Sequence, residues 1–162
     1  YSNWIAWQPN SVGNWTPNNK DVITRGTELY GKLSKGDFFI RFNSSFTQSL
    51  DQETGKQLIY VPLITVSSTV GYSYKRVLLS YNHQYVEERF IATDNSVSLP
   101  FYVIGNLNFA KSFEVEEALI NIGFKINNIF NYTYQAVVNQ PMPSRYFGVN
   151  FSIVYNNKNN KT

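Results

Sequence analysis

The sequence contains no cysteine and only one histidine among its 162 residues. Without thiols the chain cannot form a disulfide framework or a thiolate metal site. The single imidazole, His83, has no second histidine or thiol with which to complete a metal site. We therefore expect no metal and no cofactor, and we interpret His83 as a surface residue of a strand.

Long hydrophobic runs, strong charge and catalytic motifs are also missing. No segment approaches the roughly 20 consecutive apolar residues of a membrane-spanning helix, and the mean hydropathy is -0.30. The net charge is only +3 and the basic residues are scattered, which argues against a nucleic-acid partner. There is no nucleophile elbow, phosphate loop or dinucleotide fingerprint. An enzyme is therefore not expected, and any membrane crossing must use strands.

Aromatic residues, by contrast, are abundant: 12 Tyr, 12 Phe and 3 Trp make up 17% of the chain. Such rings are favoured in strands and gather where apolar and aqueous zones meet. The stretch 146–155 alternates with almost no interruption, so it predicts a strand with one polar and one apolar face. If that strand crosses a membrane, the residues expected to face lipid are Phe147, Val149, Phe151, Ile153 and Tyr155.

The same period of two recurs along the whole chain and predicts eight strands. Most are about 8 to 14 residues long, which suits the ~9–11 residues needed to cross a bilayer at a tilt. Their approximate ranges are 3–8, 21–33, 37–49, 63–74, 77–85, 100–113, 118–127 and 146–155.

The links between these strands alternate strictly between long and short. The long links are 9–20, 50–62, 87–99 and 131–144. Between one long link and the next lie two strands joined by a link of only a few residues. An up-and-down sheet places every long loop at one end and every tight turn at the other, as in outer-membrane barrels. An even strand count also predicts that both chain ends lie on the side of the tight turns, in the periplasm.

A family resemblance becomes specific in residues 126–156. Asn127, Asn128, Ile129, Phe130 and Asn131 are followed by Tyr134, and then by Pro141-Met142-Pro143-Ser144-Arg145 before the last strand. This stretch resembles the ending of TonB-dependent outer-membrane receptors, in which Gly is usual at the place of Ser144. The segment 3–29, with its Asn-Trp-Ile and Arg-Gly-x-Glu elements, is similar to the same family.

The resemblance implies an all-β fold, an antiparallel up-and-down transmembrane barrel of about 22 strands with a plug in its lumen. Residues 1–156 are then the C-terminal portion of the barrel, about eight strands, and 157–162 are a short polar tail. The implied function is uptake of a large scarce nutrient, a ferric siderophore or cobalamin, across the bacterial outer membrane. The implied partners are outer-membrane lipid, the remaining strands and plug, the metal-chelate or other small-molecule substrate, and the TonB complex through the absent N-terminal part.

The sequence leaves two alternatives open. One is a self-contained eight-stranded outer-membrane barrel acting as an anchor or adhesin, which requires pairing between the first and last strands. The other is a soluble β-sandwich binding module. On the receptor interpretation, aromatic and arginine side chains of the long loops and the upper lumen are the candidates for ligand contact. They are Trp15, Tyr60, Arg89, Phe90, Tyr132, Tyr134 and Arg145.

Overall fold

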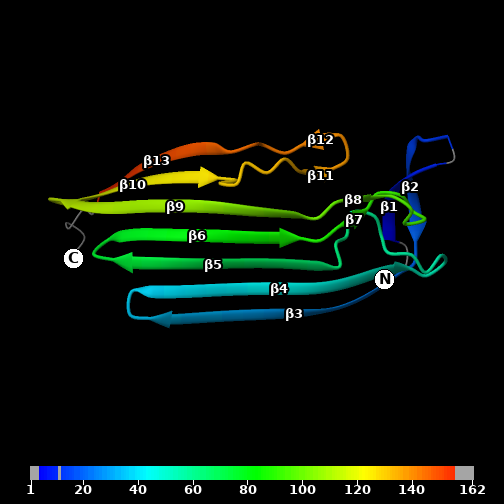
Figure 1. Cartoon of the computed structure of the whole chain (residues 1–162), viewed down its shortest axis with the longest axis horizontal. Coiled ribbons are helices and arrows are strands. Elements are labelled where there is room, and N and C mark those ends of the chain that lie inside the picture. Colours follow the sequence, from blue (N-terminus) through cyan, green and yellow to red (C-terminus); the bar gives the residue numbers. More distant parts are fainter. Residues whose placement is uncertain (1–3, 11, 156–162) are drawn as a thin grey trace, which may run out of the picture.

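Seven long strands form one antiparallel sheet in a computed structural model, which describes residues 4–10 and 12–155. Each strand pairs with the next long strand of the chain, so the sheet is an open up-and-down meander (Figure 1). The tail 157–162 lies outside the described residues. The strands are β3 (Val22–Lys35), β4 (Phe38–Asp51), β5 (Ile64–Tyr74), β6 (Val77–Val86), β9 (Tyr102–Val115), β10 (Ala118–Asn127) and β13 (Tyr146–Tyr155).

Six short strands form three hairpins at the end of the sheet that carries the long links (Figure 1). They are β1 (Trp4–Pro9) with β2 (Trp15–Lys20), β7 (Arg89–Phe90) with β8 (Ser98–Leu99), and β11 (Gln135–Val137) with β12 (Gln140–Pro141). All described strands are antiparallel and none of the described residues is helical. Among the described residues, therefore, no helix is long and apolar enough to span a membrane.

The alternation of link lengths is confirmed within the seven-stranded sheet. Tight turns join β3 to β4, β5 to β6 and β9 to β10, and positive φ angles at Gly36, Lys75, Arg76 and Glu116 close them. The links 52–63, 87–101 and 128–145 are long and lie at the opposite end. We call the two ends of the sheet the turn end and the loop end.

The first expected strand is placed differently from the prediction. β1 does not join the seven-stranded sheet but pairs with β2, inside the segment 9–20 that we expected to be a loop. The hairpin includes Pro17, which is tolerated there because an isolated two-stranded hairpin has only edge strands. With seven strands instead of eight, β3 begins at the loop end and β13 finishes at the turn end (Figure 1). The prediction that both ends lie on one side is therefore wrong for the described chain.

The strand register sorts side chains onto two unlike faces, because residues directly opposite each other in an antiparallel pair share a face. One face, the apolar face, carries hydrophobic side chains on every strand, and seven of them, one per strand, are 43% to 63% exposed. These seven are Leu29, Ile40, Val70, Leu79, Phe109, Ile122 and Phe151. The polar face carries Glu28, Ser45, Thr69, Asn82, Asn106, Asn121 and Ser152.

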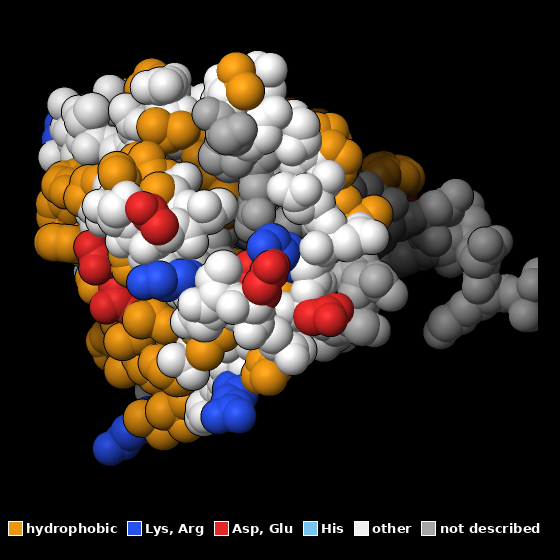
Figure 2. All heavy atoms as spheres, turned by 90° about the vertical axis from the view of Figure 1, so that its right-hand side faces the viewer, with side chains coloured by type: hydrophobic (Ala, Val, Ile, Leu, Met, Phe, Trp, Pro, Cys, Tyr) orange, Lys and Arg blue, Asp and Glu red, His pale blue; other side chains and the backbone are white. Residues whose placement is uncertain are grey.

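Hydrophobic burial within the described chain is slight. Only Val22, Leu58, Val86, Leu99 and Ile104 are buried hydrophobic residues among the described positions. In the view from the loop end, hydrophobic side chains gather along one side of the molecule (Figure 2). The sheet therefore does not wrap a core of its own, and most of its apolar surface has no protein partner in the described residues.

The sheet is open. β3 and β13 are its two outer strands, and they do not pair with each other. The pairing of 3–8 with 146–155 that a self-contained eight-stranded barrel requires is absent from the described residues, because β1 pairs with β2.

Candidate functional site

A row of hydrogen-bonded amides crosses the polar face near the loop end. Asn82 donates from Nδ2 to Thr69 Oγ1 at 3.1 Å, and Asn106 Nδ2 donates to Asn82 Oδ1 at 3.4 Å. Asn106 Oδ1 in turn accepts the backbone N–H of Asn128 at 2.9 Å. The row joins β5, β6 and β9 to the start of the link 128–145. The amides are held in fixed orientations, which suits a polar surface that recognises a ligand.

A cavity of about 270 Å³ lies on the apolar face and one of about 230 Å³ on the polar face, and the second adjoins the amide row. We call the second the luminal cavity. Strand residues of β6, β9, β10 and β13 form its floor, and the link 128–145 forms its roof. Its lining residues are Gln84, Ile104, Asn106, Asn127, Asn128, Tyr134, Met142, Pro143 and Tyr146. Uncharged donors and acceptors dominate this set, together with aromatic and thioether surface.

Tyr134 is the predicted candidate that the structure places in the luminal cavity. Its ring packs against Tyr102, with centroids 4.5 Å apart. Burial raises the pKa of the Tyr134 hydroxyl, and Tyr102 and Tyr146 raise it further. The phenol is therefore neutral at physiological pH and offers one hydrogen-bond donor and an acceptor.

The Asn-rich motif of residues 127–131 closes the roof of the cavity. Asn128 is 3% exposed, and its Nδ2 donates to the carbonyls of Tyr132 at 2.8 Å and Pro143 at 3.3 Å. Its Oδ1 accepts the N–H of Tyr132 at 2.9 Å, and Asn131 Oδ1 accepts the N–H of Arg145 at 2.9 Å. Both asparagines have positive φ, which this residue type tolerates better than most. The motif thus holds the two ends of the link together.

A second set of contacts ties the links 52–63 and 87–101 to each other. The backbone N–H of Gln57 donates to Asn95 Oδ1 at 3.0 Å, and Asn95 Nδ2 donates to the Gln57 carbonyl at 2.9 Å. The Gln57 side chain accepts the N–H of Ser49 at 2.9 Å, and the N–H of Tyr60 donates to the carbonyl of Phe90 at 2.8 Å. We call the reciprocal pair of Gln57 and Asn95 the loop clamp.

Arg89 connects the third long link to these two. It is 4% exposed, and its Nη2 donates to the carbonyl of Pro100 at 3.2 Å and to that of Gln135 at 3.1 Å. Its guanidinium also lies over the ring of Tyr102, 4.8 Å from the centroid. Its Nε and Nη1 have no hydrogen-bond partner in the described chain, nor has the buried Oε2 of Glu87. In this arrangement Arg89 holds loops together and does not present its charge at the surface.

The structure brings four of the seven candidate residues together and leaves three apart. Tyr60, Arg89 and Phe90 meet through the loop contacts, and Tyr134 joins them through Tyr102. The other three are exposed elsewhere at the loop end: Trp15 in β2, Tyr132 beside the luminal cavity, and Arg145 before β13. Ligand contact by any of the seven stays a prediction.

The residues of the site that we did not select from the sequence as ligand-contact candidates are mostly asparagines and glutamines. Gln84, Asn106 and Asn127 line the luminal cavity, while Gln57, Asn95 and Asn128 organise its surroundings. Their alternation on the strands was the available signal, since Gln84 and Asn106 lie on the polar face that the period of two defines. Within residues 4–10 and 12–155 no group of three or more His, Asp or Glu side chains is arranged to hold a metal ion.

Comparison with known proteins identifies the fold. No family model and no curated protein matches the chain. Among solved structures, it is similar to BauA, the ferric preacinetobactin receptor of Acinetobacter baumannii, with 17% identity and a TM-score of 0.75 over 93% of this chain and 25% of that one. The copper transporter OprC is similar to it with 14% identity and a TM-score of 0.73, over 90% of this chain and 26% of that one. The ferric yersiniabactin uptake receptor FyuA of Yersinia pestis is similar with 17% identity and a TM-score of 0.64, over 85% of this chain and 23% of that one.

These structures are TonB-dependent receptors, and none is an enzyme. The chain therefore has the fold of a portion of their β-barrel domain, an antiparallel up-and-down sheet that is not closed by these residues alone. The chain spans about a quarter of the length of the structures that it matches.

Proposed function

We propose that the chain is the C-terminal part of the barrel of a TonB-dependent outer-membrane receptor that imports a large metal chelate. The observation that carries this proposal is the contrast between the two faces of the seven-stranded sheet. An apolar face that runs without a break over seven strands, opposite a hydrogen-bonded polar face, matches a wall between lipid and a wet lumen.

The exposure of the apolar face supports lipid contact. Val149 and Phe151 are 75% and 63% exposed in the described chain, although both are strongly hydrophobic. Each fully buried side chain of this kind contributes about 1.5–3 kcal/mol relative to its exposed state. A continuous apolar patch of this size in water marks an interaction surface. Hydrocarbon chains cover such a face without any further protein, and the backbone bonds between strands leave few polar groups unpaired in lipid.

The ligand side of the proposal rests on the luminal cavity and the loops above it. Neutral amides and phenols at the loop end suit a bulky chelate whose metal charge is already neutralised, as in a ferric siderophore or a cobalamin. The solved structures named above import ferric chelates or copper according to their descriptions. The barrel part is passive in this scheme: capture takes place at the loops and the plug, and TonB acts through the N-terminal part.

In the same proposal residues 1–156 belong to the barrel and 157–162 form a short tail after it. The remaining strands pair with the free edges of β3 and β13, and the plug fills the lumen behind the polar face. The long loops face the cell exterior, which places the luminal cavity on the side from which the chelate arrives.

The test is chelate binding by the whole receptor that contains this segment. Tyr134→Ala removes a ring that lines the luminal cavity, whereas Tyr155→Ala removes a ring of the same size from the exposed turn end of β13. We expect weaker binding of the receptor's ferric chelate for Tyr134→Ala, unchanged binding for Tyr155→Ala, and normal heat-modifiable folding for both. Equal affinities in the two variants contradict the assignment of the luminal cavity, and a protein that is soluble without detergent contradicts the barrel.

A further inference from the structure

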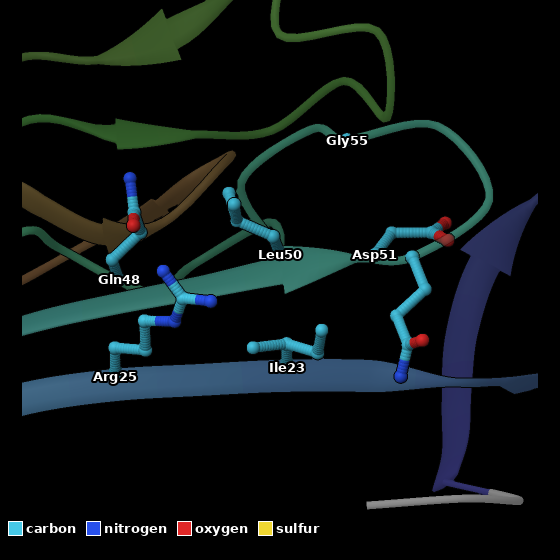
Figure 3. Close-up of a pocket in the computed structure, with 7 residues that line it drawn as sticks. Ile23, Arg25, Gln48, Leu50, Asp51 and Gly55 are labelled. Atoms are coloured by element: carbon cyan, nitrogen blue, oxygen red, sulfur yellow. The ribbon is translucent and has the colours of Figure 1, made fainter.

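The larger of the two cavities described above opens on the apolar face, at its loop end, and the luminal site does not use it. Its volume is about 270 Å³, and Ile23, Arg25, Gln48 and Leu50 line it from β3 and β4. The side chains of these four residues stand side by side on the two strands, and the link after β4 arches above Leu50 and Asp51 (Figure 3). Its remaining lining residues are Asp51, Gln52 and Gly55. We call it the outer-face cavity.

The position of Arg25 marks a boundary of the apolar band. Arg25 and Lys35 both lie on the apolar face of β3, and Thr27, Leu29, Gly31 and Leu33 separate them. At ~3.4 Å per residue the two Cα atoms are about 34 Å apart along the strand. A strand tilt near 40° converts this to about 26 Å along the membrane normal, close to the ~25 Å apolar band of such barrels. The two cations therefore bracket the band at its two head-group zones.

Arg25 has no anionic partner within residues 4–10 and 12–155. None of the three ion pairs among the described residues includes Arg25, and its side chain is exposed. The one carboxylate that lines the cavity, Asp51, is 6% exposed and already pairs with Lys20 at 2.8 Å. Gln48 lies directly opposite Arg25 in the register and adds an uncharged amide donor. The outer-face cavity therefore combines apolar walls with one cation that has no anionic partner in the described part of the chain.

We propose that the outer-face cavity binds the phosphate of a lipid in the outer leaflet, with its acyl chains lying along the apolar face. A guanidinium matches phosphate oxygens through two parallel N–H bonds, and the Gln48 amide supplies a further donor. Below the cavity the apolar face continues through Leu29 and Phe46, which offer a track for acyl chains. This inference goes beyond nutrient uptake and rests on the proposed function only through the membrane location.

The test uses the whole receptor, purified in a neutral detergent, and native mass spectrometry with added lipid A or with lipid A from which the phosphates have been removed. We expect phosphorylated lipid A to bind at least about tenfold more weakly to Arg25→Gln than to the unaltered receptor, since a charge-assisted hydrogen-bonded pair is lost. Arg25→Lys should retain part of the affinity because it keeps the charge without the bidentate geometry. Dephosphorylated lipid A should bind all forms equally weakly.

Lys35→Gln is the matched control, because it removes the same charge from the same face of the same strand at the turn end. The lipid site is overturned if Lys35→Gln loses as much affinity for phosphorylated lipid A as Arg25→Gln does. It is also overturned if inorganic phosphate competes for the receptor as strongly as phosphorylated lipid A does. Heat-modifiability separates this failure from a failure of the proposed function. A folded barrel with unaltered lipid affinity in Arg25→Gln overturns the lipid site alone, whereas a receptor that never folds in detergent overturns the barrel.

Discussion

Phe151→Arg in the whole receptor tests which face of the sheet meets lipid. Phe151 lies on the apolar face of β13, directly opposite Ile122 of β10, and is 63% exposed. From Glu117 in the tight turn to Ile122 the strand rises about 17 Å, which is about 13 Å along the normal at a tilt near 40°. Half of a ~25 Å apolar band is about 12.5 Å, so the proposed function predicts that Phe151 lies near the midplane.

An arginine at the midplane of a barrel's lipid face costs about 2–4 kcal/mol, and the cost falls to about 0–1 kcal/mol near the interfaces. Phe151→Arg should therefore destabilise the barrel by about 2–4 kcal/mol. Asn150→Arg, one residue away on the polar face beside Gly123, should cost much less. Tyr155→Arg, at the turn end of the apolar face, should cost only about 0–1 kcal/mol, because the arginine guanidinium can reach the aqueous boundary there.

The measurement is the urea midpoint of folding into lipid vesicles, followed by the heat-modifiable mobility of the folded barrel. The order of cost should be Phe151→Arg first, with Tyr155→Arg and Asn150→Arg well behind. Equal costs for Phe151→Arg and Asn150→Arg refute the assignment of the two faces. Equal costs for Phe151→Arg and Tyr155→Arg keep the faces but refute the calculated depth.

Two further predictions concern the loop end. In intact cells a single cysteine at Thr54 should react with an impermeant thiol reagent and one at Ser34 should not, because the long links face outward in the proposed function. Reaction at Ser34 alone reverses the orientation. Asn95→Ala removes both bonds of the loop clamp and leaves the backbone of the buried Gln57 unpaired, a local cost of about 1–3 kcal/mol. Hydrogen exchange at the Gln57 amide should accelerate in Asn95→Ala and stay unchanged in Ser96→Ala, because the Ser96 hydroxyl donates to the exposed Asp94 two residues earlier. Equal exchange in both variants argues against the loop clamp.

Much of the fold follows from the sequence because alternation carries direct information about a two-faced sheet. All eight expected segments form strands and seven of them make up the main sheet, and the tight turns fall where glycine or short polar links predicted them. The first strand was misassigned because periodicity reports that a segment is extended but not which segment it pairs with. Trp4–Pro9 alternates adequately, yet its partner is the nearby segment Trp15–Lys20, whose Pro17 is a poor strand signal.

The candidate site was harder to foresee because it depends on contacts between links far apart in the sequence. Gln57 and Asn95 are separated by 38 positions, and nothing local to either residue indicates the other. Arg89 was selected as a ligand-contact candidate of the long loops and upper lumen, but its guanidinium is buried and donates to the carbonyls of Pro100 and Gln135. Local alternation in the sequence predicts which segments are strands and which of their faces is polar. The packing of one loop on another depends on tertiary contacts, which no local pattern predicts.

The meander order of the sheet has a consequence for how the barrel is built. Every pairing in the seven-stranded sheet joins strands that follow each other along the chain, so no pairing has to wait for a distant segment. The entropy cost of closing each intervening loop is small because it grows only slowly with loop length. Assembly can therefore advance one hairpin at a time, with each completed hairpin presenting a fresh edge as the template for the next.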